Sequence, residues 1–405
     1  MKLDNDIIEL FDYTFNDYTK KNLYDFFEDP LNDVDDIIER QNILKGILAN
    51  EILFKFSYSK IDFYKVREYT LNIENINNIK FKLFISKELK LKIQSELVRN
   101  VYFLDNLYMY LKNINTDIFP VHFQNKIKFL YNQLIQLNVN KFKNDFSQQS
   151  FSIKTLLDIY NRFVTFSDNA KIFWNYFSEL EMYISLCKGI SKNNFTFPIF
   201  SDSFIIEGLY HPLLNNPVKN DISVNTNLNI LTGPNMSGKS TLLYSLGLCV
   251  YLSHLGLGIP AIKFTLPVFD YMVININNNN LKKGFSHFYN ELYIFKESLL
   301  QAYNNLSCFC IFDELYSGTN TVDALEISEI TFKGLGKFSN SYFFISTHLY
   351  EVFQNNKYKN CTLYNMKINY TESIPVFTYK LDEGLSEVRL GKYLFDKEEI
   401  DKLLE

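Results

Sequence analysis

The chain has 405 residues, which is enough for two or three domains that each bury a core of their own. Hydrophobic residues make up 47% and charged residues 21% of the chain, and this balance excludes an intrinsically disordered protein. The net charge of −5 argues against a protein that only coats nucleic acid.

The first half of the sequence predicts helices. Glycine and proline are rare before residue 190, and apolar residues recur at helical spacing. Phe173, Phe177, Leu180 and Ile184 mark one face of a helix. A comparable stripe after Pro30 consists of Val34, Ile37, Ile38, Leu44, Ile47 and Leu48. We interpret both stripes as packing surfaces and expect a mainly helical domain over residues 1–195.

Charge is distributed unevenly within this helical half. Residues 1–50 hold 5 basic and 12 acidic residues, whereas residues 51–150 hold 15 basic and 9 acidic residues. A surface that meets a phosphate backbone is therefore expected in the second segment. Ordinary solvated helix faces explain the same counts equally well, so charge alone does not establish DNA binding.

The second half predicts an α/β domain over residues 196–405. Short apolar runs rich in β-formers alternate with helical segments, and these runs cover residues 203–206, 228–232, 309–312 and 342–345. This alternation is typical of a mixed, largely parallel sheet covered by helices.

A phosphate-binding loop is predicted between the run 228–232 and the apolar residues that begin at Leu242. The segment reads G-x-x-x-x-G-K-[ST], and the order strand, loop, helix is the one that such a loop requires. Lys239 is expected to reach the β and γ phosphates, and Ser240 to ligate Mg²⁺. The residues expected to bind the nucleotide here are Gly233, Pro234, Asn235, Met236, Ser237, Gly238, Lys239, Ser240 and Thr241.

Two further strand ends carry candidate catalytic groups. The run 309–312 delivers Asp313 and Glu314 at its carboxyl end, and we assign Asp313 to the metal and Glu314 to the general base. His348 follows the run 342–345, where a neutral imidazole could donate to the γ-phosphate or to the attacking water.

The cysteines and the absence of long apolar stretches bear on location. The five cysteines lack metal or redox spacing, and Cys308 and Cys310 alternate with apolar neighbours as in a buried strand, which predicts a core role. No stretch is long and apolar enough to span a bilayer, and the acidic N-terminus does not have the character of a signal peptide. We expect a reducing, cytoplasmic compartment and no membrane partner.

Five ordered blocks resemble the MutS family, the ATPases of DNA mismatch repair and their relatives. The blocks are the Pro-Asn-Met-Ser form of the phosphate loop, the stretch 207–213 (EGLYHPL), the stretch 284–292 (GFSHFYNEL), the stretch 310–321 (CIFDELYSGTNT) and the stretch 346–352 (STHLYEV). More weakly, residues 12–23, 29–31, 38–41 and 180–186 resemble the helical core of MutS proteins, and 376–381 resembles the closing strand of their ATPase domain.

This resemblance implies an ABC-class P-loop ATPase that uses ATP and Mg²⁺ and works as a homodimer with composite ATP sites. It implies that Ser286 reaches the γ-phosphate bound to the other subunit, a role compatible with an N-cap. It also places adenine against Pro217, Val218 and Asn220, and double-stranded DNA against the helical domain. Three features depart from the family pattern: Pro217 replaces an aromatic residue, Asn365 a histidine, and Tyr316-Ser317 a Gly-Arg pair.

Two other functions remain open at this level. A MutS-related ATPase that acts on branched or recombining DNA without mismatch recognition fits the expected lack of an N-terminal mismatch-reading domain. The C-terminal dimerising helices are likewise expected to be missing or reduced. A small-molecule phosphotransferase would carry an arginine-rich donor site, whereas Arg389 is the only arginine from residue 196 on.

Overall fold

The computed structural model describes residues 4–55, 57–73, 76, 79–147, 152–276, 285–354, 358–371, 374–385, 395, 397 and 398. The chain divides into two compact units. The helical unit comprises residues 8–29 and 38–192, and the α/β unit comprises residues 1–7, 30–37 and 193–405. The α/β unit therefore takes two short segments from the N-terminal part of the chain, which the sequence did not predict. The division into a helical domain (1–195) and an ATPase domain (196–405) stays a prediction.

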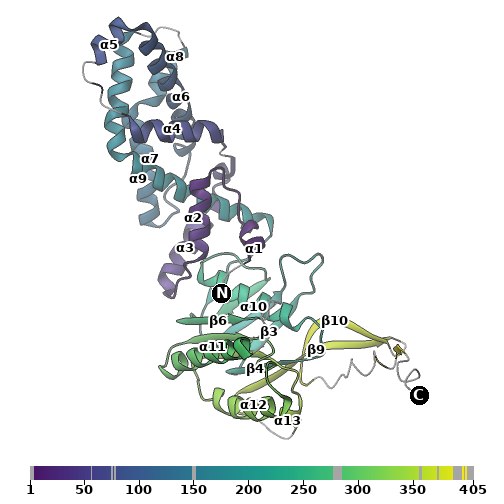
Figure 1. Cartoon of the computed structure of the whole chain (residues 1–405). Coiled ribbons are helices and arrows are strands. Elements are labelled where there is room, and N and C mark those ends of the chain that lie inside the picture. Colours follow the sequence, from purple (N-terminus) through teal and green to yellow (C-terminus); the bar gives the residue numbers. More distant parts are fainter. Residues whose placement is uncertain are drawn as a thin grey trace. The chain divides into compact units, whose positions relative to one another are not determined.

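The helical unit is organised around one long helix, α9, against which α2, α4 and α7 pack (Figure 1). Phe173, Phe177, Leu180 and Ile184 of α9 are all buried, as the spacing predicted. In the second stripe Ile37 and Ile47 are buried. The helices preceding the sheets are α1 (Asn5–Glu9), α2 (Asp17–Phe27), α3 (Val34–Ala49), η1 (Glu51–Lys55), α4 (Lys60–Asn72), α5 (Ile79–Ile85), α6 (Lys87–Leu111), α7 (Val121–Leu137), α8 (Val139–Ser147) and α9 (Ile153–Lys192).

A buried carboxylate ties the start of the chain to α9. Glu181 is 4% exposed and accepts hydrogen bonds from the Phe15 N–H (2.7 Å), Asn16 Nδ2 (2.7 Å), Thr19 Oγ1 (3.0 Å) and the Tyr58 hydroxyl (2.7 Å). Burial raises the pKa of Glu181, while the hydrogen bonds from Tyr58, Phe15 and Thr19 oppose the rise. Burying a carboxyl group is costly when its hydrogen bonds are lost, so the folded state favours an arrangement that keeps these four donors in place. The network therefore fixes the N-terminus of α2 against α9.

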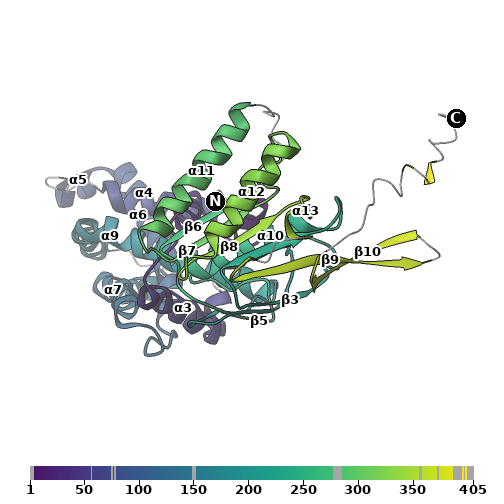
Figure 2. The ribbon, with the colours of Figure 1, turned by 90° about the horizontal axis from the view of Figure 1, so that it is seen from below.

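The α/β unit contains two sheets. The larger has the order β10-β9-β4-β8-β7-β6, with parallel pairing from β9 to β6 and β10 antiparallel at the edge; the smaller has the order β1-β5-β2-β3. The strands of the two sheets are β1 (Ile199–Phe200), β2 (Phe204–Leu209), β3 (Asn220–Val224), β4 (Leu228–Thr232), β5 (Lys263–Leu266), β6 (Tyr271–Asn275), β7 (Cys308–Phe312), β8 (Tyr342–Ser346), β9 (Cys361–Thr371) and β10 (Ile374–Glu383). The helices are α10 (Lys239–His254), α11 (Phe285–Tyr303), α12 (Thr321–Leu335) and α13 (Glu351–Gln354). This mixture of helices with mixed sheets confirms the expected fold class at that level. Figure 2 shows α11 and α12 side by side over β7 and β8.

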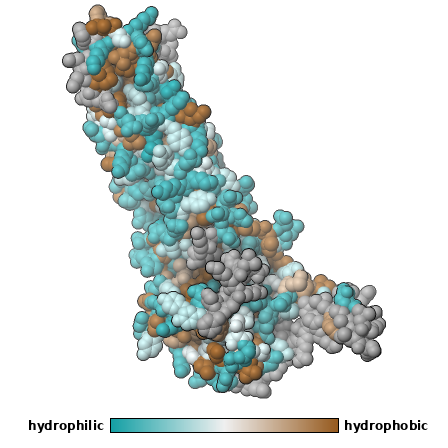
Figure 3. Space-filling view, viewed as in Figure 1, coloured by the Kyte–Doolittle hydropathy of each residue, from teal (hydrophilic) through white to brown (hydrophobic). Residues whose placement is uncertain are grey.

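The surface carries hydrophilic and hydrophobic side chains interspersed (Figure 3). Within the helical unit, the exposed apolar residues include Phe84 and Ile85 of α5, which are 79% and 65% exposed. Within the described ranges, no helix has both the length and the apolar character needed to cross a bilayer.

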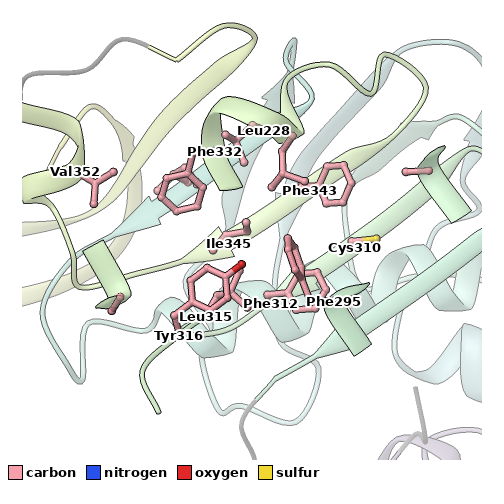
Figure 4. Close-up of a cluster of buried hydrophobic side chains, with 14 of the residues drawn as sticks. Leu228, Phe295, Cys310, Phe312, Leu315, Tyr316, Phe332, Phe343, Ile345 and Val352 are labelled. Atoms are coloured by element: carbon pink, nitrogen blue, oxygen red, sulfur yellow. The ribbon is translucent and has the colours of Figure 1, made fainter. Parts of the chain in front are cut away.

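Strand β7 is buried on both faces, which explains its uninterrupted apolar sequence. Cys308, Cys310 and Phe312 join the cluster formed under α11 and α12 (Figure 4). Phe309 points to the opposite face of the sheet, and its ring centroid lies 5.3 Å from that of Phe269. The core role predicted for Cys308 and Cys310 is confirmed. Because β7 and β8 are parallel neighbours, with Phe312 opposite Ile345, their polar continuations meet at one edge of the sheet.

Candidate nucleotide-binding site

The glycine-rich loop lies between β4, which ends at Thr232, and α10, which begins at Lys239. All five residues of β4 are buried, so the strand fixes the start of the loop. Gly233 and Gly238 have φ angles of 141° and 97°, a region in which a side chain is strained. These two positions allow the backbone to turn directly from a buried strand into the N-terminus of a 16-residue helix, whose free N–H groups favour an anion.

The side chain of Lys239 folds over this loop. Its Nζ donates to the carbonyl oxygens of Gly233 (2.8 Å) and Pro234 (3.1 Å), and the residue is only 5% exposed. Burial lowers the pKa of Lys239, and the carboxylates of Glu314 and Asp313 oppose this effect. A buried ammonium held by neutral carbonyls beside the start of a helix makes the loop strongly attractive to a polyanion.

The polar continuations of β7 and β8 form one hydrogen-bonded group. Asp313 is 3% exposed and accepts from the Ser346 hydroxyl, which in turn accepts from the Glu314 N–H at 2.8 Å. His348 Nε2 lies 2.9 Å from Glu314 Oε1. The structure therefore joins the two predicted acids through Ser346 and places His348 in direct contact with Glu314. Ser346 was not predicted as a site residue, although its position at the end of the strand beside β7 is the signal that could have identified it.

A cavity of about 750 Å³ opens beside the loop. It is lined by residues of the loop and α10, by Glu314, and by the predicted adenine contacts Pro217, Val218 and Asn220. The residues from the loop and the start of α10 are Asn235, Met236, Gly238, Lys239, Ser240 and Thr241. The Ser237 hydroxyl is buried without a hydrogen-bond partner among the described residues, so it keeps a free donor within the loop. The predicted nucleotide residues that line this cavity share it with the predicted base, whereas Gly233, Pro234 and Ser237 do not line it.

Tyr379 is a cavity residue that the sequence did not single out. It lies in a bulge of β10 with a φ of 55°, and a Cβ added at Gly238 would lie 3.2 Å from its ring. Asn220 fixes this bulge, because its Nδ2 donates to the Tyr379 carbonyl (3.0 Å) and its Oδ1 accepts from the Leu381 N–H (2.8 Å). The amide of Asn220 therefore positions β10. The only sign of Tyr379 in the sequence was an aromatic residue in the predicted closing strand, which could have suggested a cavity residue there.

Two other predicted residues lie elsewhere in the unit. Asn365 donates to the carbonyl oxygens of Glu383 (3.4 Å) and Gly384 (3.3 Å), at the end of β10. Ser286 falls in the first turn of α11, and its side chain lies outside the described residues, as do Gly284 and Arg389. The His211 ring stacks on Tyr244 with centroids 5.2 Å apart, which supports the structural role expected of the His-Pro turn.

A second cavity, of about 680 Å³, lies between α11 and α12. Its lining includes Phe295, Leu299, Ile330 and Leu335, and it contains none of the predicted nucleotide residues. Its polar groups include no acid that could act on a phosphate, so the candidate site is the cavity beside the loop.

Comparisons with known proteins find relatives of this chain. A family model described as MutS domain V matches residues 229–396. The chain is 29% identical to the DNA mismatch repair protein MutS of Staphylococcus epidermidis over 227 residues, which cover 53% of this chain and 26% of that protein. It is 26% identical to the same-named protein of Ehrlichia ruminantium over 276 residues, covering 66% and 34%. It is also 29% identical to MutS protein homolog 4 of Saccharomyces cerevisiae over 183 residues, covering 43% and 20%.

The matched stretches span a fifth to a third of the length of these relatives. The family model falls on the α/β unit, where it takes in the glycine-rich loop and the ends of β7 and β8. Together with the relatives, it supports the assignment of the chain to the MutS family.

Proposed function

We propose that this chain binds ATP with Mg²⁺ in the cavity beside the loop and hydrolyses it. One observation carries this proposal: the buried Lys239 ammonium, held by two loop carbonyls, shares its cavity with the carboxylate of Glu314. A cation at a helix N-terminus suits the β and γ phosphates, and a carboxylate nearby suits the attacking water. Proteins of the MutS family are ATPases, and this supports the same conclusion.

Asp313 and Ser240 are the proposed protein ligands of a magnesium ion. Within the described parts of the chain no group of three or more His, Cys, Asp or Glu side chains could hold a metal by itself. Mg²⁺ bound with a nucleotide needs only one or two protein oxygens, because phosphates and water complete its shell. Asp313 and the Ser240 hydroxyl would provide these oxygens. When bound, the ion would neutralise charge on the phosphates and help to orient them.

Glu314 and His348 have different roles in the proposed hydrolysis of ATP. Glu314 takes a proton from water as the water oxygen forms its bond to the γ-phosphorus, and the bond from that phosphorus to the bridging oxygen breaks, leaving its electron pair on ADP. His348 donates through Nε2 to Glu314 Oε1, which holds the carboxylate in one orientation. Lys239 stabilises charge on the phosphates during this transfer.

We further propose that the chain works on DNA as a homodimer. The relatives named as DNA mismatch repair proteins support DNA as the macromolecular ligand. Exposed lysines on α5 and at the start of α6 suit contacts to a phosphate backbone. The helix α11 carries Ser286 at its N-terminus, a position suited to meeting a phosphate on a second chain.

A direct assay tests the catalytic part of this proposal. Purified protein is incubated with Mg²⁺ and ATP labelled at the γ-phosphate, with a parallel sample in EDTA and a Lys239→Ala sample as controls. Phosphate release that needs Mg²⁺ and Lys239 is expected. A wild-type chain that neither binds nor hydrolyses ATP would overturn the proposal.

A further inference from the structure

One carboxylate near the candidate site has no part in the mechanism above. Glu291 lies on α11 and is 3% exposed, and its Oε1 has no hydrogen-bond partner among the described residues. The residue accepts a hydrogen bond from the Tyr316 N–H. Buried acids are costly unless they are paired, so a half-satisfied carboxyl in this place needs an explanation.

The turn that donates this hydrogen bond is the one that carries Glu314. Glu314 and Tyr316 have φ angles of 55° and 70°, so two residues other than glycine adopt the left-handed conformation within three positions. Such strain persists only where the surroundings determine the conformation. Ser346 holds one side of the turn through the Glu314 N–H, and Thr331 of α12 contacts the Tyr316 hydroxyl at 2.8 Å.

The third side of the turn is held by one face of α11. Phe288, Glu291 and Phe295 are three and four residues apart, so they lie on one side of the helix. A Cβ added at Gly318 would lie 3.1 Å from Phe288 Cβ, and the rings of Phe295 and Tyr316 have centroids 6.1 Å apart. Figure 4 shows Phe295 and Tyr316 within the same cluster. Glu291 is the polar residue on this face of α11, whereas Phe288 and Phe295 contact the turn through apolar side chains.

We propose that Glu291 is a positioning residue, which fixes the turn bearing Glu314 and couples it to α11. This inference rests on the proposed ATPase function and adds to it a connection between two parts of the site. Ser286 lies five residues before Glu291 on the same helix. A contact made at the N-terminus of α11 by a second chain would therefore move the acceptor of the Tyr316 N–H, and with it the backbone of Glu314.

The charge state of Glu291 is consistent with such a role. Burial raises its pKa to about 7, the Tyr316 N–H lowers it, and the nearby Glu314 raises it. Both forms of the carboxyl accept from the Tyr316 N–H, and so does the amide oxygen of glutamine. Leucine has a similar size but no acceptor. Glu291→Gln and Glu291→Leu therefore separate hydrogen bonding from packing.

The first test measures the turn without requiring catalysis. Hydrogen exchange followed by mass spectrometry, in a peptide covering residues 313–320, is compared among wild type, Glu291→Gln, Glu291→Leu and the control Glu297→Leu. Glu297 is a partly exposed glutamate on the same helix. Exchange about 10-fold faster in Glu291→Leu, and near wild type in the other two, is expected for local loosening of the turn. Unchanged exchange in Glu291→Leu would overturn the proposal.

The second test measures the consequence for ATP. Glu291→Leu is expected to lower kcat about 10-fold or more, because small misplacements of a catalytic group are costly, while the Kd for ATP changes less than about 3-fold. Glu291→Gln, which keeps a hydrogen-bond acceptor, should have a kcat close to that of the wild type. Equal losses of kcat, ATP affinity and thermal stability in both variants would show a purely structural role. If wild type hydrolyses no ATP, the proposed function fails, and the exchange experiment still decides whether Glu291 fixes the turn.

Discussion

His348 Nε2 and Glu314 Oε1 lie 2.9 Å apart, although the two residues come from different strand ends. β7 and β8 are parallel neighbours, so residues that follow them emerge at the same edge of the sheet. The imidazole therefore holds one oxygen of the carboxylate. This pair gives the carboxylate a defined direction, which a general base requires.

The first prediction concerns Glu314 itself. Glu314→Gln keeps the shape and the contact to His348 but loses the basic oxygen, so it should bind ATP while hydrolysing it at least ~100-fold more slowly. Single-turnover hydrolysis and equilibrium binding of ATP measure the two properties separately. Normal turnover in this variant would mean that another residue is the base.

The second prediction concerns Lys239. Lys239→Ala removes the buried ammonium that we propose to face the phosphates, so nucleotide binding or turnover should be abolished. Lys263→Ala is the matched control, because Lys263 is an exposed lysine of the same unit. Titration of ATP into both variants measures the effect. An ATPase rate equal to wild type in Lys239→Ala would refute the site assignment.

The third prediction concerns DNA. Lys80, Lys82 and Lys87 are exposed and Lys90 is half-buried, and all four lie on α5 or at the start of α6. Reversing these charges should weaken binding to all duplexes alike and reduce the slope of log K against log salt by about 3–4. The measurement is binding to matched, mismatched and branched DNA at several salt concentrations.

A control for this prediction uses lysines of the α/β unit. Reversing the four exposed lysines Lys333, Lys337, Lys359 and Lys367 changes the net charge equally but leaves α5 and α6 intact. Their reversal should alter the salt slope much less. Binding that is unchanged in the α5–α6 variant, or lost only for mismatched DNA, would contradict backbone contacts by this segment.

The fourth prediction concerns assembly. If Ser286 of a second chain completes the γ-phosphate site, ATP bridges two chains and favours the dimer by mass action. Glu314→Gln with Mg-ATP should sediment as a dimer, and adding Ser286→Arg should return it to monomer while ATP stays bound. A dimer of equal stability without nucleotide, or one that tolerates Ser286→Arg, would show association through another surface.

The fifth prediction concerns Tyr316, which is 2% exposed and has a φ of 70°. Removing the buried ring costs about 3–5 kcal/mol, and a left-handed alanine costs about 1 kcal/mol more than glycine. Both Tyr316→Gly and Tyr316→Ala should therefore destabilise the protein, with alanine the worse of the two. Urea unfolding measures the order, and the reverse order would contradict the left-handed conformation.

The pattern of the sequence was sufficient for the main elements of the α/β unit. The run 228–232 coincides with β4, and the runs 309–312 and 342–345 match β7 and β8 to within one residue. These strands are buried on both sides, so their sequences are continuous and apolar and leave few alternatives. The stripe after Pro30 was less informative, since Val34 and Ile38 are 37% and 41% exposed.

The amino-acid sequence was sufficient to predict the residue types of the site and their order along the chain: a glycine-rich loop with Lys239, two acids after one strand, and a histidine after another. These are local features, because the chemistry depends on short segments that adjoin predictable strands. Three contacts became visible only in the folded chain: Ser346 joins Asp313 to Glu314, Asn220 holds the bulge of β10, and Glu291 accepts from the Tyr316 N–H. Each of these contacts joins residues at least 25 positions apart, and strand order and helix packing bring them together. Their partners cannot be inferred from local spacing, because a polar side chain in a sequence does not indicate which distant backbone group it will meet.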